Sequence, residues 1–145
     1  TATNGEIRQP YMYSTMVSNF VPADEFLEIL EDARVIPSAG QEPTIDTMFW
    51  TMRLYPFSWR LTAQKVIITM TDEIAQTILG KDCNEINDIA IEDGFELFVF
   101  ALEPHHNTFL DCVNGQNRRL FTPAANSETV FLQIRRIFDD LCIDR

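Results

Sequence analysis

Two stretches of almost continuous apolar residues stand out in the chain, residues 64–71 ("QKVIITMT") and 94–102 ("GFELFVFAL"). Neither stretch alternates between apolar and polar residues. Continuous apolar runs of this length are typical of strands that are buried on both faces, as in a parallel sheet. A third, shorter strand is predicted at 118–122 ("RRLFT").

Helical periodicity occupies most of the chain between and around these strands. Ile45, Met48, Phe49 and Met52 recur at helical spacing and predict a helix over 45–55 that ends near Pro56. Helices are also predicted over 73–80 and 83–92, separated by Gly80, and over 103–115, closed by Asn114-Gly115. The last helix is capped by Asn126 or Ser127 and has one apolar stripe, made of Val130, Phe131, Ile134, Ile137, Phe138 and Leu141.

The N-terminal third has no continuous apolar run of this kind and predicts an extended segment followed by a helix. Residues 5–20 are rich in residues that favour strands, and Pro10 restricts them to an edge or bent strand. Residues 21–33 predict a helix with Pro22 at its start. From Lys65 onward strands alternate with helices, which predicts an α/β fold with a mainly parallel, Rossmann-like sheet flanked by helices.

Composition narrows the classes of function. A chain of 145 residues with 46% hydrophobic residues fits one domain, 1–145. Its formal net charge of -11 disfavours nucleic acid and anionic membranes as partners. The chain has no apolar run of the ~20 residues that cross a bilayer and no signal segment at its start. It begins without Met, so we expect a processed chain or a fragment.

Few residues occur in patterns that indicate ligand binding or catalysis. Asp72 ends the strand at 64–71, where ligands bind in open α/β sheets, although an Asp there also caps a following helix. His105-His106 is most simply a surface pair. The block Arg135-Arg136 and Asp139-Asp140 fits pairing four residues apart on a helix surface. No nucleophile triad, phosphate-binding loop or paired carboxylates are found, so no enzymatic activity is expected.

The ordered segments resemble the von Willebrand factor type A domain, and most of all the I-like domain of integrin β subunits. The resemblance rests on "GQEPTIDT" (40–47), on "SWRLTAQKVIITMTDE" (58–73), and on "ELFVFALEPHHNTFLDCV", "RRLFT" and "FLQIRRIFDDLC" in that order. It covers nearly the whole chain. It implies an adhesion or matrix module that binds a protein partner, at the cell surface or outside the cell.

The resemblance also implies a site for Mg²⁺ or Ca²⁺ built from three loops. Glu42 or Thr44 would belong to the second loop and Asp72 to the third, and a partner's acidic group would complete the coordination. Such cations bind oxygen ligands, which these residues supply. Glu42 is otherwise an ordinary loop acid, and Thr44 otherwise serves as the N-cap of the 45–55 helix.

The Asp-x-Ser-x-Ser motif of the family's first loop is missing from this sequence. In this fold that loop follows the first, central strand, beside the strand that ends at Asp72. One explanation is that the chain is the C-terminal portion of a domain and that the central strand comes from a second chain or fragment. The other is that residues 5–20 replace that strand and the metal site is lost. A metal-independent structural module of a filament, tail or matrix is therefore the alternative function.

The three cysteines, Cys83, Cys112 and Cys142, lack the spacing of a zinc site. They are either buried thiols in a reducing compartment or an odd set with one thiol left over. The resemblance implies a Cys83–Cys112 pair on neighbouring helices, with Cys142 bonded to a partner in the missing N-terminal part.

Overall fold

The computed structural model describes residues 2–3, 6–7, 42–54, 59, 61–123 and 127–143. Its elements in chain order are β1 (Ala2–Thr3), β2 (Glu6–Ile7), α2 (Thr44–Phe49), the π-helical η2 (Trp50–Leu54), β3 (Lys65–Met70), α3 (Cys83–Asp93), β4 (Phe95–Phe100), η3 (Glu103–His105), α4 (His106–Phe109), η4 (Asp111–Val113), η5 (Asn117–Arg119), β5 (Leu120–Phe121) and α5 (Ser127–Ile143). The helix predicted over 21–33 lies outside these ranges. Of the extended segment predicted over 5–20, only β2 is described, and it pairs antiparallel with β1.

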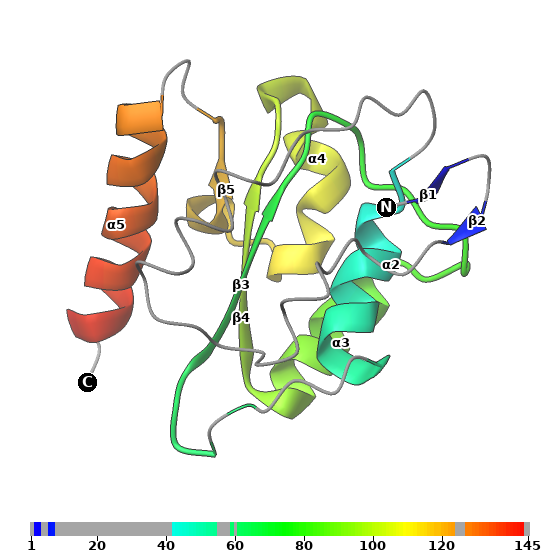
Figure 1. Ribbon diagram of the computed structural model, residues 1–145, viewed down its shortest axis with the longest axis horizontal. Helices are drawn as coiled ribbons and strands as arrows, with labels where there is room; N and C mark the ends of the chain where they lie inside the picture. Colours follow the sequence, from blue (N-terminus) through cyan, green and yellow to red (C-terminus); the bar gives the residue numbers. More distant parts are fainter. Residues whose placement is uncertain are drawn as a thin grey trace.

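The main sheet has three parallel strands in the order β3-β4-β5. Helices cover both of its faces, with α2, α3 and α4 on one side and α5 on the other (Figure 1). The predicted α/β class and the parallel sheet are therefore confirmed. The hydrogen bonds of the sheet extend past β4, where the Thr71 N–H donates to the Phe100 carbonyl over 2.9 Å and the Ala101 N–H to the Phe121 carbonyl over 2.9 Å.

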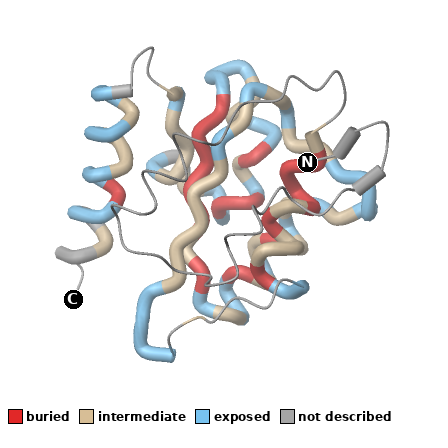
Figure 2. Tube along the Cα trace, in the orientation of Figure 1, coloured by how far each residue is buried: buried red, intermediate tan, exposed pale blue. Residues whose placement is uncertain are grey.

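Alternate residues of β4 divide the core between the two faces. Leu97 and Val99 pack with Met48 of α2 and Ile86 of α3, all almost fully buried. On the other face Phe98 and Phe100 pack against α5, whose Ile137 is only 1% exposed. Figure 2 shows this buried strand at the centre of the molecule. The prediction that 94–102 forms a strand buried on both faces is confirmed.

The same prediction for β3 is wrong. Its residues are half-buried and Met70 is 53% exposed. The reason is its position, because β4 is its sole neighbour among the strands that the structure describes. A strand with one neighbour leaves one edge and part of each face open.

Two helix predictions need correction. Residues 73–80 are not helical, because tertiary partners bind their backbone groups: the Ile45 N–H donates to the Gln76 carbonyl, and the Asp46 carboxylate accepts from the Ile78 N–H. In α5 the predicted single stripe is divided. Ile137 faces the sheet, whereas Phe131 and Phe138 are 63% and 50% exposed.

Of the strand predicted over 118–122, only Leu120 and Phe121 form β5, and Arg118 and Arg119 belong to the 3-10 helix η5. Three further predictions agree with the structure. The 45–55 helix appears as α2 followed by η2, and the 103–115 segment as η3, α4 and η4 with Asn114 and Gly115 at positive φ. Arg135 pairs with Asp139 as predicted, at 3.9 Å on the exposed face of α5. In the described ranges, no helix has both the length and the apolar character needed to span a bilayer.

Gly94 turns the chain from α3 into β4 with φ 72° and ψ 40°, a left-handed conformation. We expect Gly94→Ala to lower the free energy of unfolding by about 1 kcal/mol, because a Cβ is strained there even though no atom lies within 4 Å of it. Gly94→Asn is the matched control and should cost less, since Asn tolerates this conformation. Urea unfolding measures both. Equal losses for the two variants would contradict this explanation.

Candidate functional site

The candidate site lies where β3 ends and the α2 segment begins. The Thr71 hydroxyl donates a hydrogen bond to the Glu42 carboxylate, with 3.3 Å between Oγ1 and Oε2. The same hydroxyl accepts from the Glu73 N–H over 3.1 Å. The predicted second and third loops therefore meet at the carboxyl end of the sheet, as ligand sites in open α/β sheets do.

Asp72 follows Thr71 and is exposed. The alternative role of Asp72 as a helix cap is wrong, because no helix follows it. The turn after β3 is held by Thr71, whose hydroxyl binds the Glu73 N–H. Asp72 is therefore an exposed residue at the end of β3, next in sequence to the Thr71 that contacts Glu42.

Thr44 lies close to the site in sequence but faces inward. It is 6% exposed, and its hydroxyl donates to the Glu42 carbonyl oxygen over 3.2 Å. The alternative N-cap role is also wrong, since Pro43 is the N-cap of α2 and makes no side-chain cap bond. Of the three predicted ligands, Glu42 contacts Thr71, the residue before the exposed Asp72, and Thr44 is engaged with the backbone.

Oxygen donors make up the candidate set, with two carboxylates and the Thr71 hydroxyl. This chemistry fits Mg²⁺ or Ca²⁺, which prefer carboxylate, hydroxyl, carbonyl and water oxygens. The described part of the chain, however, contains no group of three or more His, Cys, Asp or Glu side chains that could hold a metal ion. A cation bound here would need further ligands from water or from another polypeptide segment.

Asp46 is the residue of this region that the sequence did not reveal. It is 1% exposed, and its carboxylate accepts from the Thr77 hydroxyl at 2.7 Å, the Ile78 N–H at 2.6 Å and the Leu79 N–H at 3.2 Å. These bonds fix the loop that follows Asp72 onto α2. All three partners are more than 30 residues away in the chain, so no local pattern could have shown the role.

The structure places two of the three cysteines in a disulfide and one of the two histidines in a contact with the backbone. Cys83 and Cys112 form a disulfide between the first residue of α3 and η4, which confirms the pairing that the resemblance implied and excludes the alternative of three free thiols. The side chain of Cys142 lies outside what the structure describes. His106 Nε2 lies 3.0 Å from the Ala101 carbonyl oxygen, which suits a structural contact at the end of β4.

Comparisons of the chain with family models, with curated proteins and with solved structures found no match.

Proposed function

We propose that the chain is a protein-binding module of von Willebrand factor A type that serves adhesion or matrix assembly outside the cell. In this proposal a divalent cation at the carboxyl ends of the strands engages an acidic group of the partner. The observation that carries the proposal is the contact between Glu42 and Thr71, which joins the two predicted ligand loops next to the exposed Asp72. The disulfide supports an oxidising compartment, where such bonds persist.

One edge of β3 pairs with no strand among the described residues, which supports a second polypeptide segment in the complete assembly. No strand in the described ranges pairs with this edge, and β3 carries one charge, Lys65, at its first position. Natural edge strands are commonly protected by charges, prolines or bulges, and the stretch Val66 to Met70 has neither a charge nor a proline. A strand supplied by a second chain or fragment would cover the edge and bring a further loop to the cation. This partner is part of the proposal.

The metal-independent structural module is the second candidate. The observation that favours it is the lack of three metal-ligating acidic, His or Cys side chains in the described residues. The two candidates differ in one measurable property, the response to a divalent cation.

We expect Mn²⁺, a paramagnetic substitute for Mg²⁺, to broaden the amide NMR signals of Glu42 and of Thr71 to Glu73 before others. Asp72→Asn should weaken this binding at least about tenfold, because the carboxylate supplies negative charge to the cation. Asp88→Asn is the matched control, since Asp88 is exposed on α3, and it should leave the titration unchanged. If Asp72→Asn and Asp88→Asn behave alike, the cation site is refuted and the structural module stands.

A further inference from the structure

A cavity of about 530 Å³ opens at the other end of the sheet from the candidate site. It lies at the start of the strands. Gln64 precedes β3, Glu96 is the second residue of β4 and Arg119 immediately precedes β5. The volume is in the range of small-molecule sites, roughly 300–1,000 Å³.

One wall of the cavity is apolar. It is formed by Phe98, Phe121 and Leu141, which come from β4, β5 and the last turn of α5. The two rings are 6.4 Å apart and tilted by 45°, so they present a broad aromatic surface. A flat or branched apolar group can bury its surface against this wall and is favoured there by the hydrophobic effect.

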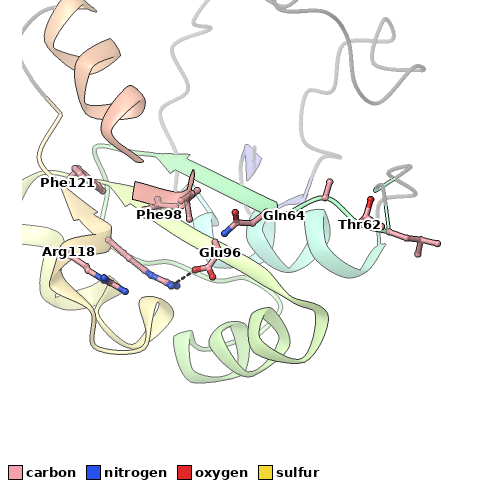
Figure 3. A pocket seen from close by; sticks show the side chains of 10 residues that line it. Thr62, Gln64, Glu96, Phe98, Arg118 and Phe121 are labelled. Carbon is pink, nitrogen blue, oxygen red and sulfur yellow. Dashed lines mark ion pairs between the residues drawn. The ribbon is translucent and has the colours of Figure 1, made fainter. Parts of the chain in front are cut away.

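The rest of the lining includes polar side chains, two of them arginines. Arg119 is neutralised because it pairs with Glu96, and its guanidinium lies 5.7 Å from the centre of the Phe98 ring. Arg118 differs. Its side chain is exposed, its Nε donates to the Gln116 side-chain oxygen over 3.1 Å, and no carboxylate whose side chain the structure describes pairs with it. Figure 3 shows Arg118, Glu96, Phe98 and Phe121 among the side chains that line the cavity, with the ion pair of Glu96 as a dashed line.

These observations together describe a cavity whose lining combines an apolar surface with an arginine that pairs with no carboxylate among the described side chains. In a chain with a formal net charge of -11, a guanidinium that no described carboxylate pairs with is the feature that selects the charge of a ligand. We propose that this cavity binds a small amphipathic carboxylate, with an aromatic or branched aliphatic body against Phe98 and Phe121 and its carboxylate on Arg118. The site is separate from the proposed cation site and does not depend on it.

The test uses 1-naphthaleneacetate as the probe and its neutral amide, 1-naphthaleneacetamide, as the matched ligand without charge. Each is titrated into the ¹⁵N-labelled chain. We expect saturable shifts of the amide signals of Phe98, Phe121 and Leu141, with the acid bound about fivefold more tightly than the amide because of the charge-assisted hydrogen bond.

Arg118→Gln should remove this difference by weakening binding of the acid about fivefold while leaving binding of the amide unchanged. Arg136→Gln, at an exposed position of α5, is the control and should change neither. Gln64→Trp should fill the cavity and weaken both ligands. Equal affinity for acid and amide, an Arg118→Gln variant that binds the acid as well as the parent chain does, or shifts that persist in Gln64→Trp would each overturn the proposal.

Discussion

Reduction of the Cys83–Cys112 disulfide is expected to lower the free energy of unfolding by roughly 3–4 kcal/mol. The bond joins residues 29 apart, and opening it restores the freedom of that loop in the unfolded chain. Cys112 is fully buried in the core between α3 and β4, so the folded state keeps the two sulfurs close after reduction. The loss therefore comes chiefly from the unfolded state and not from a rearranged fold.

Urea unfolding with and without a phosphine reductant measures this loss. A Cys83→Ala/Cys112→Ala double variant should reproduce it without reductant, with a further small cost for the cavity left by the buried Cys112. Cys142→Ala is the control and should keep the full response to the reductant. An unchanged unfolding midpoint in a sample whose mass shows free thiols would contradict the expected loss.

Replacement of Asp46 is expected to have an effect of similar size. Asp46→Ala removes the acceptor for the Thr77 hydroxyl and for the Ile78 and Leu79 N–H groups, and leaves these donors without their partner. Since a hydrogen bond to a charged group contributes about 1.5–3 kcal/mol and burial limits compensation by water, we expect a total loss of about 3 kcal/mol.

Asp46→Asn separates hydrogen bonding from mere packing. The amide keeps one oxygen to accept from the Ile78 and Leu79 N–H groups and turns its NH₂ toward Thr77, whose hydroxyl can accept. We expect this variant to lose about half as much as Asp46→Ala. Asp88→Ala, on the exposed face of α3, serves as the control for removing a carboxylate. Near-equal stability of Asp46→Ala and Asp88→Ala would show that the three bonds contribute little.

Two kinds of element were predictable from sequence: a strand that is enclosed on all sides and a helix whose ends are set by nearby residues. β4 has a strand on each side and helices over both faces, so nearly all of its residues are apolar and the apolar run alone predicts a buried strand. α3 begins at a local signal, the Asp82 cap, whose side chain accepts from the Glu85 N–H, and it ends at Gly94. In both cases residues close in the chain carry the information.

The predictions that were wrong concern segments whose structure depends on contacts that the local sequence pattern does not show. The 73–80 segment has a helical pattern, but α2 and α4 supply partners for its backbone, including the Thr108 hydroxyl that accepts from the Ala75 N–H over 3.0 Å. Thr44 looked like a cap because its type favours one, yet Pro43 occupies that position. At the candidate site, the resemblance implied that Glu42 and Asp72 belong to loops of one site but did not reveal the Thr71 hydroxyl that contacts Glu42.

The pairing of β3 with β4 has a consequence for the order in which the chain folds. The two strands are joined by one crossover that contains α3, and each pair from Lys65 with Phe95 to Met70 with Phe100 is about 30 residues apart in sequence. Contacts that close short loops carry a small entropic cost and form early. The parallel pairing of β3 with β4 is therefore expected to form later than the local contacts within α3, because it must first close this loop.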